Sequence, residues 1–265
     1  MAAALGASIS AQARIIFTCF TRLLQMKTRD TPLGVLSSLV EPLAAICVMT
    51  IVFTNVKFKV PKLGDYLMLF LMTGMLPISM FRQGSMESER GFQRLRRNLA
   101  LPQVQTTDLM LAGIFTSFLL MTALFMTLTI FFWLVYNAPW PQNIVFCLIP
   151  AVCNSLMGFG IGMVNLVIKS WFLYWGTIFA VVTAPLGVMS GMFYTIDKMP
   201  PSIQNILYYN PLMHSTELTR TYYYKEYTST FFDPLYYYGC VFTILSLGLL
   251  CERTFRYRIL NEKKK

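Results

Sequence analysis

The chain has 265 residues, of which 55% are hydrophobic and only 13% are charged, and its formal net charge is +10. This composition lies outside the range of soluble domains and indicates an integral membrane protein. The basic residues stand at the ends of apolar runs, so membrane topology explains them better than a nucleic-acid partner does. Six scattered cysteines and a single histidine argue against a disulfide framework or a metal site.

The first segment, residues 1–31, predicts an interfacial helix. Ile16, Phe20 and Leu23 repeat at helical spacing, while Arg14 and Gln25 fall on the opposite side. A helix with this pattern lies in the plane of the membrane surface. A soluble helix packed on a partner is the alternative interpretation.

Six apolar runs follow, and each is long enough to cross a hydrocarbon core of about 30 Å. They predict an all-α integral membrane fold, with one transmembrane domain over residues 1–265. The predicted spans are residues 33–53, 66–84, 107–136, 144–168, 171–194 and 235–252.

Glu41 lies inside the first predicted span. An ionised side chain at the centre of a span is unfavourable by roughly 2.5–3.5 kcal/mol, so this carboxylate is expected to face protein or a water-filled cavity. It has either a structural bond to a neighbouring helix or a role in transport.

A charged segment, residues 87–101, separates the second and third spans. Phe92 and Leu95 fall on one side of a helix, and charged residues fall on another, which predicts an amphipathic helix. It is either a docking helix for a partner or an ordinary basic loop that fixes topology. The candidate docking residues are Glu87, Arg90, Phe92, Arg94, Leu95 and Arg97.

Glycines punctuate the fourth span. Gly158 and Gly162 form a small-xxx-small face that favours close helix contact. A nucleotide-binding loop is not indicated, because no strand precedes these glycines and no phosphate-binding lysine follows them.

Residues 195–233 predict two short helices, 199–209 and 212–224, separated by Asn210 and Pro211. They either re-enter the membrane or lie on it. Tyrosines gather there, and they suit both an interface belt and a sugar-stacking surface. Those assigned to a substrate path are Tyr208, Tyr222, Tyr223 and Tyr224.

The distribution of basic residues predicts the orientation. With both termini inside, 16 of the 22 Lys and Arg residues fall in inner segments and six in outer ones. The positive-inside rule therefore places both termini and residues 87–101 in the cytoplasm.

Four motifs carry a resemblance to a known family. They are LGVLSSLVEP (33–42), LPQVQTTDLMLAG (101–113), SGMFYTIDKMP (190–200) and NPLMHSTELTR (210–220). With these motifs the chain resembles the membrane subunit of type-2 ABC exporters, in particular capsular polysaccharide permeases of the KpsM kind, with O-antigen permeases as relatives. It departs from the family at Lys169-Ser170, where an arginine-aspartate pair is common.

The resemblance implies an inner-membrane permease that works as a homodimer with two copies of a separate cytoplasmic ATPase. ATP and Mg would bind that partner, since this sequence has no G-x-x-x-x-G-K-[ST] loop and we expect no cofactor of its own. In the family the helix between spans two and three inserts into the ATPase. A periplasmic adaptor and an outer-membrane exporter are also implied.

The transport hypothesis is that a lipid-linked anionic polysaccharide is drawn from the cytoplasmic leaflet by arginines. These are Arg82, Arg90, Arg94, Arg96 and Arg97. In the last motif, four polar residues are expected to bond to one another and fix the hairpin. They are Asn210, His214, Glu217 and Arg220.

Three other functions compete with this reading. The same fold could export an O-antigen, a teichoic acid-like polymer, or a small drug or lipid. A membrane-embedded glycan- or lipid-modifying enzyme would use His214 and Glu217, but the sequence offers no convincing nucleophile or metal set, and we expect no catalytic residue. A passive channel or secondary transporter should show inverted repeats, which are not evident.

Overall fold

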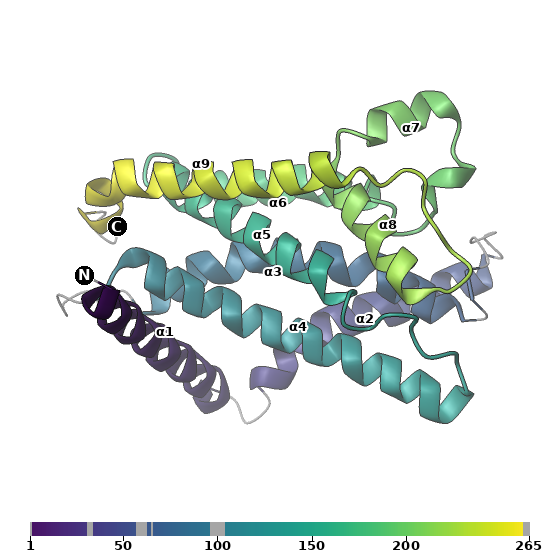
Figure 1. The fold of residues 1–265 in the computed structure, drawn as a ribbon, viewed down its shortest axis with the longest axis horizontal. Coiled ribbons are helices and arrows are strands. Elements are labelled where there is room, and N and C mark those ends of the chain that lie inside the picture. The colour runs from purple at the N-terminus through teal and green to yellow at the C-terminus, as the bar shows by residue number, and fades with distance from the viewer. Residues whose placement is uncertain (1, 31–33, 57–62, 65, 96–103, 262–265) are drawn as a thin grey trace.

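The computed structural model describes residues 2–30, 34–56, 63–64, 66–95 and 104–261, and every long regular element within these ranges is a helix. Figure 1 shows a bundle of long helices with both chain termini at one end, which we call the terminal end. The short helices α7 and α8 lie at the opposite end, which we call the hairpin end. The helices are α1 (Ala2–Asp30), α2 (Gly34–Asn55), α3 (Leu67–Leu95), α4 (Thr106–Tyr136), α5 (Leu148–Lys169), α6 (Trp175–Val188), α7 (Pro201–Leu207), α8 (Pro211–Tyr223) and α9 (Pro234–Asn261).

The core of the bundle is built by α3, which packs against both α4 and α5, while α5 packs in turn against α9. Glycines permit the close approach. A Cβ atom on Gly113 of α4 would lie 2.1 Å from the carbonyl oxygen of Glu87, and one on Gly158 of α5 would lie 2.5 Å from that of Phe81. The glycine face predicted in the fourth span therefore contacts α3.

The structure corrects the prediction of a separate charged helix over residues 87–101. The second span and most of the charged segment form one continuous helix, α3, and residues 96–101 lie outside the described ranges. Phe92 and Leu95 are buried in a cluster with residues of α1 and α4. Because this packing covers the apolar side, and no proline follows Pro77 within α3, the helix continues without a break.

Apolar character along the described helices fits a membrane protein. Three helices are long and apolar enough to cross a bilayer, namely α4, α5 and residues Pro234–Leu260 of α9. Two shorter apolar helices are Leu39–Asn55 and Trp175–Val188. A fold made of several apolar helices satisfies its backbone polar groups internally, as lipid requires.

The fifth predicted span, residues 171–194, is helical only over α6. The chain leaves the helix and turns at Gly191, whose φ is +77°. This left-handed conformation suits glycine and ends the helix early. A short 3₁₀ turn, Ile196–Lys198, leads into α7.

The two short helices predicted around Asn210 and Pro211 are present as α7 and α8. The Asn210 side chain accepts a hydrogen bond from the Leu212 backbone N–H, and Pro211 occupies the first helical position. Both features are favourable at a helix start, which explains why α8 begins there.

Candidate functional site

A pocket of about 400 Å³ lies between α3, α5 and α6 near the terminal end. Three cations and one anion line it together with polar and aromatic side chains, and we call it the charged pocket. The lining residues used below are Arg82, Glu89, Arg90, Asn165, Lys169 and Trp175.

Hydrogen bonds hold one wall of the charged pocket in place. Asn165 of α5 donates to the Ser85 hydroxyl at 3.1 Å and accepts from the Trp175 indole N–H at 2.8 Å. Lys169 Nζ lies 2.5 Å from Glu89 Oε1 and so joins α5 to α3. Charge-assisted contacts of this length are among the stronger polar interactions, so the relative position of the two helices is well defined here.

Arg82 and Glu41 form an ion pair across α3 and α2, with an N···O distance of 3.6 Å. Their side chains are 55% and 76% exposed, although both helices are largely apolar. Ionised groups avoid contact with lipid chains, so this pair is expected to face water or another protein surface. The structural bond considered for Glu41 is thus present, while its part in transport stays a prediction.

A second ionic group fixes α1 against α3. Glu87 is buried and contacts Lys27 at 3.4 Å and Arg90 at 3.1 Å. Burial lowers the pKa of Lys27 below its ordinary value, and the neighbouring Glu87 carboxylate opposes this shift. Gln12 of α1 also donates to both carboxylate oxygens of Asp108, at 2.7 and 2.6 Å. Helix α1 is therefore tied to the bundle by polar contacts as well as by apolar ones.

Three cations and one carboxylate line the charged pocket: Lys169 pairs with Glu89, while Arg82 and Arg90 also contact Glu41 and Glu87, which are not among its lining residues. Arginine binds phosphate and carboxylate groups through parallel N–H donors. Aromatic Trp175 and the α6 residues beside it add an apolar wall. The arrangement suits an amphipathic molecule with an anionic group, such as the head of a lipid-linked substrate.

The predicted docking residues divide into two sets. Arg90 and Arg94 are exposed, whereas Glu87, Phe92 and Leu95 are buried by other parts of this chain. In the described part of the segment, residues 87–95, the apolar side is therefore already covered and the polar side is available to a partner. Arg96 and Arg97 lie outside the described residues.

The four hairpin residues do not form one mutually bonded group, contrary to the sequence-based expectation. Only Glu217 and Arg220 pair with each other, at 3.5 Å. Asn210 donates to the Ser190 hydroxyl at 2.9 Å, and His214 Nε2 lies 2.9 Å from the Tyr208 carbonyl oxygen. Asn210 and Arg220 instead join α8 to the turn after α6, His214 joins it to Tyr208 at the end of α7, and Glu217 joins it to Tyr227.

Arg220 is the central residue of the hairpin end. It is fully buried and donates to the carbonyl oxygens of Gly191 and Tyr194, each at 2.7 Å. Its guanidinium also lies 4.2 Å from the centre of the Phe70 ring in α3. Glu217 accepts a short hydrogen bond from the Tyr227 hydroxyl. The buried ion pair thus binds α8 to the α6–α7 turn and to α3.

The predicted substrate-path tyrosines lie in different environments. Tyr208 donates to Asp233 at 2.5 Å, and Tyr222 stacks on Phe146 with ring centres 5.4 Å apart. Tyr223 and Tyr224 are buried and line a second pocket at the hairpin end.

Sequence reasoning missed four residues of the charged pocket, namely Glu89, Asn165, Lys169 and Trp175. Arg82 and Glu89 are seven residues apart and so lie on one face of α3, and this spacing is a signal that could have identified Glu89. The contact from Glu89 to Lys169 joins positions 80 residues apart, and no local pattern predicts it. Among the described residues, no three His, Cys, Asp or Glu side chains are grouped to hold a metal.

Similarity to known proteins extends over most of the chain. The capsule polysaccharide export inner-membrane protein BexB of Haemophilus influenzae is 24% identical over 94% of this chain and 93% of its own length. The polysialic acid transport protein KpsM of Escherichia coli is 22% identical over 89% and 91%.

A third relative matches a shorter stretch. The capsule polysaccharide export inner-membrane protein CtrC of Neisseria meningitidis is 25% identical over 109 residues, which is 41% of each chain. This chain therefore matches less than half the length of CtrC. The family described as ABC-2 type transporter matches residues 14–224, and the chain belongs to that family.

Proposed function

We propose that this chain is the membrane-spanning subunit of an ATP-driven exporter that moves lipid-linked capsular polysaccharide out across the bacterial inner membrane. The observation that carries the proposal is the similarity to BexB and KpsM along nearly the whole chain. The charged pocket supports it, because its cations suit the anionic groups of such a substrate.

In this proposal α2, α3, α4, α5, α6 and α9 cross the membrane, and α1 lies along its inner surface. The distribution of basic residues supports a cytoplasmic position for the terminal end. The hairpin end, with α7 and α8, then faces outward, and these short helices re-enter the membrane from that side.

The lipid-linked substrate reaches the charged pocket from the inner leaflet. Arg82 and Arg90 bind its phosphate or carboxylate, and the apolar wall at Trp175 contacts the lipid. Two copies of the chain pair to enclose the path of the sugar polymer. The exposed Glu41–Arg82 pair faces that path, where water is present.

The energy comes from two copies of a separate ATPase, which bind ATP and Mg. That partner docks on the polar side of the α3 end, where Gln93 and Arg94 are exposed. A periplasmic adaptor and an outer-membrane exporter receive the polymer. This chain supplies the path and performs no catalysis.

The test is to delete the gene in the source bacterium and locate the surface polysaccharide by cell fractionation. We expect polymer to accumulate inside the cell. Normal surface polymer would overturn the polysaccharide assignment and favour a small drug or lipid as substrate.

Two variants then separate the roles of the basic residues. The double variant Arg82→Gln with Arg90→Gln should trap polymer inside the cell while the ATPase still co-purifies. The fold should tolerate both substitutions, because Glu41 is exposed and Glu87 keeps its contact with Lys27. Arg94→Glu should release the ATPase. Arg253→Gln, an exposed residue of α9, is the matched control and should export normally. Unchanged export by the double variant would show that the charged pocket is not used.

A further inference from the structure

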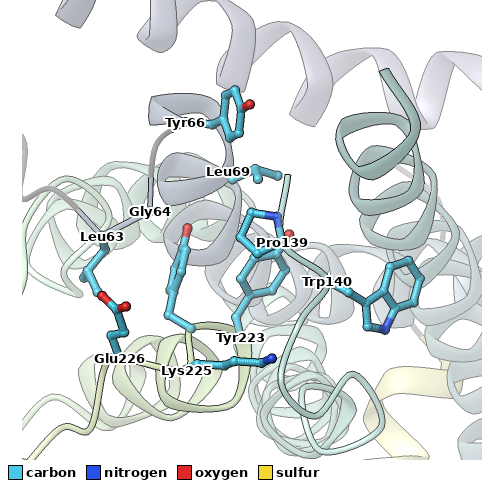
Figure 2. Close-up of a pocket in the computed structure, with 10 residues that line it drawn as sticks. Leu63, Gly64, Tyr66, Leu69, Pro139, Trp140, Tyr223, Lys225 and Glu226 are labelled. Carbon is cyan, nitrogen blue, oxygen red and sulfur yellow. The ribbon is translucent and has the colours of Figure 1, made fainter. Parts of the chain in front are cut away.

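A second pocket, of about 640 Å³, lies at the hairpin end, and we call it the aromatic pocket. This volume is within the usual range of roughly 300–1,000 Å³ for ligand sites. Figure 2 shows Tyr66 on one side of it and Lys225 and Glu226 on the other. Its aromatic and charged lining residues are Tyr66, Trp140, Tyr223, Tyr224, Lys225 and Glu226.

Three segments that are far apart in sequence build this pocket, and backbone bonds hold them together. The N–H groups of Gln142 and Asn143 donate to the carbonyl oxygens of Tyr223 and Tyr222, at 3.2 and 3.0 Å. The Tyr66 hydroxyl donates to the Tyr136 carbonyl oxygen at 2.6 Å. The walls of the pocket are therefore formed before any ligand binds.

Gly64 closes one edge of the aromatic pocket. Its φ is +72°, and a Cβ atom there would lie 2.9 Å from the ring of Tyr224. Only glycine suits both the conformation and the contact. The main chain can thus lie directly on an aromatic ring, which shapes the edge of the pocket.

The chemistry of the lining is unlike that of the charged pocket. Tyr66 and Trp140 are partly exposed, and each combines an apolar ring face with a polar group. Lys225 and Glu226 are exposed neighbours, and within the described ranges neither forms an ion pair. Lysine can only donate hydrogen bonds and an ionised glutamate can only accept them.

A sugar ring matches both features. Its C–H face packs on an aromatic ring, and each of its hydroxyls can both donate and accept hydrogen bonds, so different hydroxyls can bond a lysine and a carboxylate. Among the described lining residues, one positive and one negative side chain give no net preference for charged sugars. A simple anion or cation would meet attraction and repulsion together.

We propose that the aromatic pocket binds a sugar ring of the exported polymer and accepts neutral and acidic sugars alike. The ring stacks on Tyr66 or Trp140, and Lys225 and Glu226 bond its hydroxyls. This inference rests on the proposed function, because it requires that the hairpin end meets the polymer as it leaves the membrane.

The experiment uses the complex of this chain with its ATPase in lipid nanodiscs, which are open on both faces. The chain is labelled with 5-fluorotryptophan, and the Trp140 resonance is followed by ¹⁹F NMR. Comparison with Trp140→Phe assigns the resonance among the four tryptophans of this chain. The probes are a neutral glucose tetrasaccharide and a galacturonic acid tetrasaccharide. Sorbitol, which has hydroxyls but no ring, is the control ligand.

We expect both tetrasaccharides to shift the Trp140 resonance with midpoints within threefold of each other, and sorbitol to leave it unchanged. Lys225→Met with Glu226→Gln should weaken binding at least fivefold. Lys198→Met, an exposed lysine outside the pocket, should bind as the unaltered protein does.

Three results would overturn the inference: no shift with either sugar, a shift that the double variant retains in full, or a response to galacturonate alone. Failure of the pocket is distinguishable from failure of the proposed function. If neither sugar shifts the Trp140 resonance but the strain exports polymer normally, only this inference is overturned. If surface polymer is normal after gene deletion, the proposed function itself is overturned.

Discussion

The charged pocket and the aromatic pocket contact the same helix, α3, toward its opposite ends, but they are built from different chemistry. At the terminal end three cations surround one carboxylate, and α3 supplies Arg82, Glu89 and Arg90. At the hairpin end the rings dominate, the two charges cancel, and α3 supplies only Leu69 beside the preceding Tyr66. One end is suited to select for negative charge and the other for ring shape.

The difference teaches how a single subunit can treat the two parts of a lipid-linked glycan separately. In the proposed exporter, a charge-selective pocket would recognise an anionic lipid attachment whatever sugars follow. A pocket without net charge would then accept the varied sugars of the chain. The following predictions test this division, from the largest expected effect to the smallest.

Removal of the Arg220 guanidinium should disrupt the hairpin end alone. Arg220→Met leaves the Glu217 carboxylate buried without its partner, and loss of one member of a buried pair reduces stability by about 3–5 kcal/mol. Thermal unfolding of the solubilised protein measures this change. Arg253→Met is the control, and equal melting of the two variants would show that Arg220 does not support the hairpin.

Addition of one methyl group should disturb the terminal end alone. In Gly113→Ala the new Cβ would meet the Glu87 carbonyl oxygen at 2.1 Å, which forces α3 and α4 apart at a cost of about 1–3 kcal/mol. Gly239→Ala is the matched control, since nothing lies within 4 Å of its added Cβ atom. Melting temperatures of both variants give the comparison, and a neutral Gly113→Ala would contradict this packing.

The charged pocket should bind anions more tightly when its one carboxylate is removed. Glu89→Gln eliminates a repulsion worth about 1 kcal/mol at solvent-like dielectric, which corresponds to roughly a fivefold gain in affinity. Titration with a short-chain phosphatidylglycerol measures it. Glu226→Gln in the other pocket should leave this affinity unchanged, and weaker binding by Glu89→Gln would oppose the electrostatic account.

The smallest effect concerns acid stability at the hairpin end. Burial lowers the pKa of His214, so below its ordinary value of 6.5 the unfolded chain binds more protons than the folded one, and stability falls as pH drops. Melting at pH 7.5 and 5.5 should show a shallower dependence in His214→Asn.

The comparison isolates the histidine, because it is the single one in the chain. Burial raises the pKa of Glu217, whose titration acts in the opposite sense, but that residue is present in both proteins. Identical pH dependence in the two proteins would show that His214 keeps its ordinary pKa.

Much of the fold was predictable from apolar runs and helix-breaking residues. The run of apolar residues that became α4 was predicted as 107–136 and is observed as Thr106–Tyr136. Asn210 and Pro211 correctly divided the hairpin into α7 and α8. These features depend on local spacing and backbone geometry, which the sequence contains directly.

The continuity of α3 was not predictable in the same way. Its charged half has the pattern of an independent amphipathic helix, and only the contacts of Phe92 and Leu95 with α1 and α4 show that the apolar side faces inward. The same limit applies to the site. Arg82 was identified by its charge, but Lys169 and Glu89 meet through tertiary packing that no local pattern shows.

Because α3 is one continuous helix, it connects the charged pocket directly to the aromatic pocket. Its 29 residues span about 43 Å at 1.5 Å per residue. Pro77, in the half of α3 nearer the hairpin end, removes one backbone hydrogen bond, and Asn154 of α5 donates to the Pro77 carbonyl oxygen at 2.7 Å, so the weakened turn of α3 is also held by α5. In the proposed exporter, a displacement of the α3 end that carries Arg94 would bend the helix at Pro77 and move Tyr66 beside its other end, which would link ATPase docking to the aromatic pocket.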